Sequence, residues 1–133
     1  MELFHGEKRG DIHAFSHAVV DAGADLVLGT GPHVVRSMEM YRGKLIAYSL
    51  GNFATVKQFN LLGWNGVSVV LEAELKPDGK FVRGKLIPTW QGSYGVPEVD
   101  SRGIGTDLVR WLSREDFPRS GIKIARDGAF TAR

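Results

Sequence analysis

The stretch GADLVLGTGPHVV, residues 23–35, carries an apolar run into a loop of two glycines, a proline and one histidine, His33. Residues 25–28 are mostly apolar and bounded by glycine, a pattern typical of a covered parallel strand. Before them, Asp11 offers a helix N-cap and apolar residues recur at helical spacing, so we expect a helix over residues 11–22. Helix, tight turn and strand in this order predict half of an α/β crossover.

Two hairpins follow this crossover in the sequence. Residues 38–41 and 45–50 are strand-like runs separated by the turn sequence RGK, in which glycine adopts a positive φ at little cost. Residues 67–75 and 80–88 flank the sequence PDG, one of the strongest turn signals in proteins. Both pairs of runs therefore predict antiparallel strands.

The last part of the chain predicts a helix and then a tail. Residues 105–115 hold apolar side chains at helical spacing behind Thr106, a suitable cap, and Pro118 ends the run. From residue 120 onward, glycine, basic and small residues show little apolar periodicity. We therefore expect a single domain over residues 1–119 and a flexible tail over residues 120–133. The predicted fold class is α/β, with a mixed sheet, hairpins and flanking helices.

The composition excludes several classes of protein. With 43% hydrophobic and 24% charged residues the 133-residue chain matches a soluble globular domain, and no apolar run approaches the roughly 20 residues that cross a bilayer. A net charge of +2 with scattered basic residues argues against a nucleic-acid partner. The chain has no cysteine, so any metal must be held by histidine, carboxylate or asparagine side chains. The first residues lack the pattern of a signal peptide.

Sequence fingerprints of three common enzyme classes are missing. The chain contains no G-x-S-x-G elbow, no phosphate-binding G-x-x-x-x-G-K-[ST] loop and no G-x-G-x-x-G sequence, so serine hydrolases, nucleotide hydrolases and Rossmann enzymes have no support. Trp64, Trp90 and Trp111 are scattered along the chain. This distribution favours core filling over a stacking platform for sugars or bases.

Two candidate site residues each follow a predicted strand. His33 comes after residues 25–28, and Asn52 comes after the run that ends in SLG. Because ligands bind at the carboxyl ends of strands in open α/β sheets, both side chains are well placed for chemistry. Imidazole serves as a metal ligand or general base, and an amide hydrogen-bonds substrate oxygens. The alternative is that both residues simply belong to turns, since glycine and asparagine tolerate positive φ.

The remaining histidines are weaker candidates. His13 and His17 are four residues apart on the expected helix and share a face, which is the geometry of a two-histidine metal clip. A carboxylate that would complete the clip is not obvious in the sequence, so an exposed pair of histidines is the favoured interpretation. His5, with Glu7 and Asp11 nearby, is weighed in the same way.

Residues 19–53, VVDAGADLVLGTGPHVVRSMEMYRGKLIAYSLGNF, strongly resemble the CapA family of bacterial proteins associated with poly-γ-glutamate capsule synthesis. The family has a fold similar to the calcineurin-like metallophosphoesterases, and residues 66–88 fit its next hairpin more loosely. The resemblance implies the C-terminal half of such a sandwich. It also implies a divalent metal, which would be manganese, zinc or iron, and a location at the cell surface.

The resemblance assigns roles to the two glycine loops. His33 is expected to act as metal ligand or general base and Asn52 to position the substrate, while Thr30, Gly31 and Ser49 are expected to contact it. The family's loop usually reads GHHPH or GHGPH, so Thr30 stands where a histidine is usual. The family's other metal motifs would lie before residue 1, and His5-Gly6 lies too close to the DAGAD segment to be one of them.

Two functions follow from this resemblance. The first is a metal-dependent hydrolase that acts on a phosphoester or on an amide or ester bond, although a two-metal centre needs more ligands than His33 and Asn52. The second is a non-catalytic domain of capsule or exopolysaccharide assembly that binds an anionic polymer or a partner. A truncated half-domain would expose an unpaired sheet edge, so we expect a homodimer, which also brings two His33 loops together.

Overall fold

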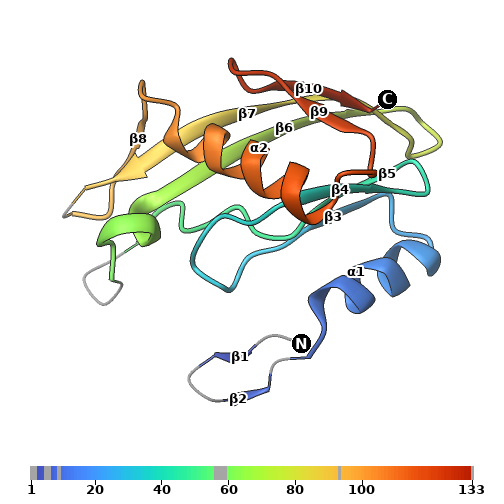
Figure 1. The fold of residues 1–133 in the computed structure, drawn as a ribbon, viewed down its shortest axis with the longest axis horizontal. Coiled ribbons are helices and arrows are strands. Elements are labelled where there is room, and N and C mark those ends of the chain that lie inside the picture. Colours follow the sequence, from blue (N-terminus) through green and yellow to red (C-terminus); the bar gives the residue numbers. More distant parts are fainter. Residues whose placement is uncertain (1–2, 5–6, 9, 56–59, 93, 133) are drawn as a thin grey trace.

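The computed structural model describes residues 3–4, 7–8, 10–55, 60–92 and 94–132, which form two α-helices, a short 3-10 helix and three sheets (Figure 1). The elements are β1 (Leu3–Phe4), β2 (Glu7–Lys8), α1 (Ile12–Asp21), β3 (Leu26–Leu28), β4 (Met38–Tyr41), β5 (Lys44–Ala47), the 3-10 helix (Gly63–Gly66), β6 (Val67–Leu75), β7 (Phe81–Gln91), β8 (Pro97–Val99), α2 (Ile104–Asp116), β9 (Ile122–Ile124) and β10 (Ala129–Ala132). The expected α/β class is confirmed. None of the helices in these ranges is long and apolar enough to span a bilayer.

The small sheet has the strand order β3-β5-β4 and is mixed, because β3 runs parallel to β5 while β4 runs antiparallel to it. Helix α1 precedes β3, and the Asp11 side chain accepts a hydrogen bond from the Ala14 amide at 3.0 Å, as its cap role predicts. The turn between β4 and β5 has positive φ at Arg42 (50°) and Gly43 (76°), which suits a two-residue hairpin. The predicted crossover and first hairpin are both confirmed.

The large sheet is antiparallel and has the order β6-β7-β10-β9, with β8 paired to the end of β7. Its long hairpin, β6 and β7, confirms the strands predicted on either side of the PDG turn. The turn closes through a 2.8 Å hydrogen bond from the Gly79 amide to the Lys76 carbonyl. Gly79 has a φ of 75°, the left-handed conformation for which glycine is suited.

The small sheet packs between the large sheet and α1 (Figure 1). Its inner face, with Met38 and Leu45, shares one core with Val69 and Leu86 of the large sheet and Val109 of α2. Its outer face is covered by α1 in a second, smaller core that contains Val20, Ile46 and Tyr48. The segment after β5 is thereby held between two packed layers.

The expected flexible tail over residues 120–133 is wrong for the part of it that the structure describes. Strand β10 pairs with β7 and β9 pairs with β10, so both extend the large sheet. Phe130 is 2% exposed and its ring stacks on that of Phe81, with centroids 5.3 Å apart. These strands are too short to show a periodic pattern. Strand β10 is ordered by pairing with β7, and β9 is ordered in turn by pairing with β10.

Two further expectations need correction. Helix α2 begins behind Gly103, whose φ is 74°, whereas Thr106 lies buried within the helix and does not cap it. The tryptophans do not fill the core either: Trp64 and Trp111 are 60% and 52% exposed. Trp90 is partly covered, and the Arg102 guanidinium lies 5.4 Å from its ring centroid. Gly103 already provides the turn into the helix, so no threonine cap is needed there.

Candidate functional site

The structure brings His33 and Asn52 together, as their positions after two strands predict. Strands β3 and β5 are parallel neighbours, so the loops that follow them leave the sheet at the same edge. The two chain segments stay paired beyond the strands, because the Gly29 amide donates to the Ala47 carbonyl at 2.7 Å and the Leu50 amide donates to the Gly29 carbonyl at 3.2 Å. The site is therefore built on the carboxyl edge of the small sheet.

A set of hydrogen bonds fixes the Asn52 amide. Its Nδ2 donates to the backbone carbonyls of His33 at 3.2 Å and Asn65 at 3.1 Å, which leaves Oδ1 as the acceptor. His33 Nδ1 lies 2.7 Å from that Oδ1 and must therefore donate its proton to it. In a neutral ring this arrangement places the lone pair on Nε2, the form in which a histidine binds a metal or accepts a proton.

The backbone around this pair depends on close approach and on positive φ. A Cβ on Gly29 would lie 2.1 Å from the Tyr48 carbonyl oxygen, so only glycine fits between the two segments. His33 itself has a φ of 62°, which is unusual for a residue other than glycine. Strained conformations of this kind persist where the surrounding contacts hold them, here through the hydrogen bonds of Asn52.

Asn52 is more than a turn residue. It is 7% exposed, and its own carbonyl oxygen accepts a hydrogen bond from Nε2 of Gln91 on β7. Asn52 thus links the loop after β5 to the large sheet as well as to His33 and Asn65. Sequence reasoning missed Asn65 and Gln91, because these contacts form only when the two sheets pack together.

The three expected substrate contacts are placed differently from one another. Thr30 and Gly31 lie exposed in the loop before His33. Ser49 is 2% exposed, and its hydroxyl oxygen accepts a hydrogen bond from the Gly51 amide at 3.3 Å. Ser49 is therefore buried under the loop, and its hydrogen bond stabilises the turn that precedes Asn52.

The His33 loop does not by itself provide a complete two-metal centre. Within the described ranges, the one group of three histidine or carboxylate side chains close enough to share an ion is His13, His17 and Glu39, and His33 is not in it. A two-metal centre needs several ligands for each ion. His33 and Asn52 supply part of such a set, and His5, the other N-terminal candidate, lies outside the described residues.

The second cluster joins α1 to β4. His17 Nε2 lies 3.0 Å and His13 Nε2 lies 3.6 Å from Oε2 of Glu39, the carboxylate that the sequence pattern did not reveal. The Tyr48 hydroxyl donates a 2.6 Å hydrogen bond to the same oxygen. Burial, and then the hydrogen bond and charge of Glu39, raise the pKa of Tyr48, so the phenol stays neutral and remains a donor.

These features define a class of protein: an α/β domain that gathers polar side chains at the carboxyl edge of parallel strands. Residues 5–57 match the family described as Bacterial capsule synthesis protein PGA_cap. The chain is 52% identical to the capsule biosynthesis protein CapA of Bacillus anthracis over 40 residues, which are 30% of this chain and 10% of that protein. The resemblance drawn from residues 19–53 is confirmed to the extent that the family match and the matches to both CapA proteins cover part of this chain.

Two other relatives agree with this assignment. The PGA biosynthesis protein CapA of Bacillus subtilis is 39% identical over 66 residues, which are 48% of this chain and 16% of that protein. A probable polyglutamine synthesis accessory protein of Mycobacterium tuberculosis is 49% identical over 43 residues, 32% of this chain and 11% of that protein. The matches thus span between 10% and 16% of the length of these relatives.

Proposed function

We propose that the chain belongs to the hydrolytic part of a CapA-like, metal-dependent enzyme that acts on a phosphoester or on an amide or ester bond. The observation that carries this proposal is the 2.7 Å hydrogen bond from His33 Nδ1 to Asn52 Oδ1. It supports a ring with its lone pair on Nε2, at the sheet edge where ligands bind in this class of fold. Asn52 acts as the positioning residue for that ring.

His33 would work in one of two ways. As a general base, its Nε2 accepts a proton from the attacking water. The Nδ1 proton stays on the ring throughout and is donated in a hydrogen bond to Asn52 Oδ1. As a ligand, Nε2 binds a divalent ion, which would be manganese, zinc or iron. The described residues by themselves supply too few ligands for a two-metal centre.

The missing ligands have two sources under this proposal: other parts of the CapA-like protein, or a second copy of the chain. Within the described residues β3 pairs only with β5, so its other edge carries unpaired backbone groups next to Leu28, which is 53% exposed. An edge of this kind favours pairing with a second copy. Leu28→Lys should reduce the mass measured by light scattering from dimer to monomer, while the exposed control Leu62→Lys should not, and a monomeric wild type would contradict the dimer.

The activity test uses p-nitrophenyl phosphate, bis(p-nitrophenyl) phosphate and γ-glutamyl p-nitroanilide, each with added manganese, zinc or iron(II). His33→Ala should lower the turnover of the accepted substrate by about 10²-fold or more, the usual contribution of a general base. The exposed variant Lys80→Ala serves as the control, since Lys80 lies in the distant turn between β6 and β7. Unchanged hydrolysis in a folded His33→Ala protein would overturn the proposal, and no hydrolysis by a dimeric wild type with any ion would exclude a site completed by a second copy.

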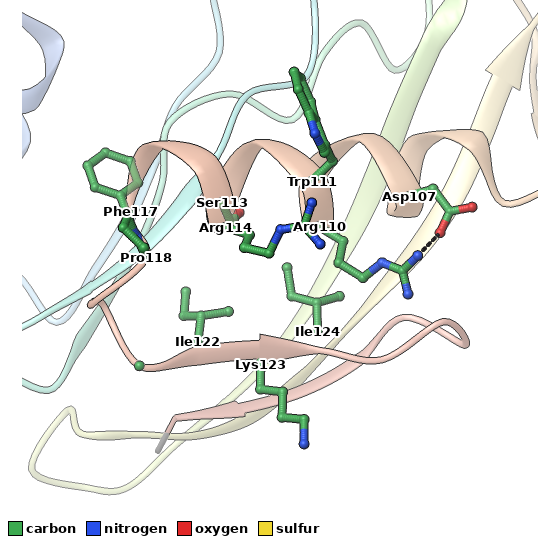
Figure 2. Close-up of a pocket in the computed structure, with 11 residues that line it drawn as sticks. Asp107, Arg110, Trp111, Ser113, Arg114, Phe117, Pro118, Ile122, Lys123 and Ile124 are labelled. Carbon is green, nitrogen blue, oxygen red and sulfur yellow. Dashed lines mark ion pairs between the residues drawn. The ribbon is translucent and has the colours of Figure 1, made fainter.

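A second function, the binding of an anionic polymer, is favoured by a groove between α2 and β9 with a volume of about 430 Å³. Figure 2 shows Arg110 and Arg114 of α2 along this groove and Ile122 and Ile124 of β9 facing the helix, whereas Lys123 points away from it. Arg110 is paired with Asp107 at 2.9 Å, which lowers the charge it offers.

Polymer binding has its own test. Polyglutamate of defined length should bind with an affinity that falls as salt is raised, since exposed charges are screened. Arg110→Gln with Arg114→Gln should abolish that binding, whereas Lys123→Gln, which removes the charge directed away from the groove, should leave it nearly unchanged. Equal loss in both variants would point to unspecific attraction by the basic chain.

A further inference from the structure

Glu39 is an acid in an unusual place, on the buried outer face of the small sheet beneath α1. The residue is 8% exposed and stands between Met38 and Met40 on β4. Three groups face its carboxylate: His13 and His17 of α1, and the hydroxyl of Tyr48, the residue directly after β5. A buried carboxylate is costly unless a cation or strong donors compensate its charge.

The three ligand atoms lie at distances that suit one metal ion. Two ligands bound at about 2.0–2.1 Å to a tetrahedral ion lie roughly 3.3–3.4 Å from each other. The contacts of Glu39 Oε2 with His17 Nε2 (3.0 Å) and His13 Nε2 (3.6 Å) fall on either side of that value. One ligand atom from each of the three residues lies within 4.8 Å of the others.

The surrounding side chains hold the three residues in this arrangement. The His17 ring stacks on Tyr41, with centroids 3.7 Å apart, and the His13 ring stacks on Phe117 at 5.7 Å. Tyr48 donates to the Glu39 oxygen, and a carboxylate oxygen with two lone pairs can accept this bond and still bind an ion. Outer contacts of this kind orient ligands in known metal sites.

Access to the cluster comes from the side of His13. Its side chain is 49% exposed, compared with 21% for His17 and 11% for Glu39. His13 also lines a pocket of about 360 Å³, together with Tyr48, Phe117 and the segment Val34–Ser37 that follows His33. A fourth ligand, water or a group of a bound molecule, has room on this side.

We propose that His13, His17 and Glu39 bind a divalent transition-metal ion of the zinc type, with one coordination position open toward this pocket. Two imidazoles and one carboxylate are a ligand set that suits zinc and its neighbours, and three protein ligands with an open position are typical of reactive zinc sites. The site is separate from the His33 loop and does not depend on the function proposed for that loop.

The competing explanation is a metal-free clamp, in which His17 donates to Glu39 and fastens α1 to the sheet while His13 contributes only its ring contacts. The two explanations differ for His13. In the clamp the cluster binds no ion and His13 is not needed for the contact between His17 and Glu39, whereas in the metal site replacement of His13 removes one of three ligands. His13→Gln is also safe for folding, because the side chain is half exposed and belongs to the surface of α1.

The experiment titrates the metal-free full chain with zinc by calorimetry and with cobalt(II) by visible absorption. One ion per chain is expected, and His13→Gln, His17→Gln and the nearly isosteric Glu39→Gln should each weaken it by more than about 100-fold, since even outer contacts contribute 10- to 100-fold. The control is Glu74→Gln, which changes an exposed carboxylate of β6 and should retain full binding, and His33→Gln tests separately whether an ion binds in the His33 loop. Circular dichroism and thermal unfolding confirm that each variant is folded.

Three outcomes would overturn the proposal. The first is no stoichiometric binding by the wild type. The second is weakening by the histidine variants but not by Glu39→Gln, which would show an exposed two-histidine clip without the carboxylate. The third is loss of the ion in His33→Gln alone, which would place it in the His33 loop. If Glu39→Gln does not fold, His13→Gln still decides between the metal site and the clamp.

Discussion

His33 and Asn52, 19 residues apart in the sequence, are joined by a 2.7 Å hydrogen bond between Nδ1 and Oδ1 at the carboxyl edge of the small sheet. The amide of Asn52 is held in turn by two backbone carbonyls, so the ring and its support form one unit. A buried side chain with this many partners has structural as well as functional consequences, because its loss leaves buried acceptors without donors.

Replacement of Asn52 should therefore destabilise the fold. Asn52→Ala removes the donor to the carbonyls of His33 and Asn65, and we expect the free energy of unfolding to fall by about 1–3 kcal/mol. Urea denaturation measures this change. The exposed Asn60→Ala, which removes a local hydrogen bond from the Leu62 amide, should cost less. Equal losses in the two variants would show that the buried bonds of Asn52 contribute little.

Acid should weaken the fold through Asp100. Burial acts to raise the pKa of this carboxyl, but hydrogen bonds from the Arg102 side chain at 2.8 Å and amide at 3.1 Å outweigh burial and lower its pKa below 3.8. A carboxyl whose pKa is lowered by folding stabilises the protein at pH values above its pKa in the unfolded chain. This stabilisation is lost as the pH falls through the pKa of the folded state.

The free energy of unfolding measured against pH tests this dependence. Asp100→Asn should flatten the loss of stability that begins below about pH 4. Arg102→Gln should make the same loss of stability smaller, since hydrogen bonding by the Arg102 side chain is one cause of the lowered pKa of Asp100. If the free energy of unfolding falls equally at low pH in both variants and the wild type, other carboxyls cause the acid sensitivity.

The C-terminal strands should contribute to global stability. A Cβ at Gly84 on β7 would lie 2.4 Å from the Phe130 ring and 2.6 Å from the Glu72 carbonyl oxygen. Gly84→Ala should therefore cost about 1–3 kcal/mol of unfolding free energy through overpacking. The matched control is Gly92→Ala, whose Cβ meets nothing within 4 Å and should be nearly neutral. A neutral Gly84→Ala would restore the interpretation of residues 120–133 as a loose tail.

The first half of the fold follows from local patterns in the sequence. Asp11 before an apolar helix, and glycine after residues 25–28, encode helix and strand over short distances, and both were predicted. His33 and Asn52 were found for the same reason, because each follows a strand and parallel strands end at one edge. Sequence alone did not show that the two side chains bond to each other.

What the sequence did not reveal depends on packing between distant segments. In the sequence Glu39 is indistinguishable from an ordinary strand residue. It contacts His13 and His17 because α1 packs over β4. Residues 122–132 have too little apolar periodicity to be recognised as strands, and their order comes from the pairing of β10 with β7 and of β9 with β10. Patterns with a period of two or 3.6 residues carry no information about such contacts.

Thr106 offers the last prediction, since it is the expected cap that instead lies buried inside α2. It is 1% exposed, and its hydroxyl oxygen has no hydrogen-bond partner among the described residues. A buried polar group without a partner costs stability, so Thr106→Val should leave the unfolding free energy unchanged or raise it by up to about 1 kcal/mol. Thr89→Val is the matched variant, because Thr89 is also buried, at 4% exposed, but shares a 2.7 Å hydrogen bond with Ser68. That variant should lose about 1–3 kcal/mol in the same urea titration. Comparable losses at both positions would show that the Thr106 hydroxyl is satisfied in solution.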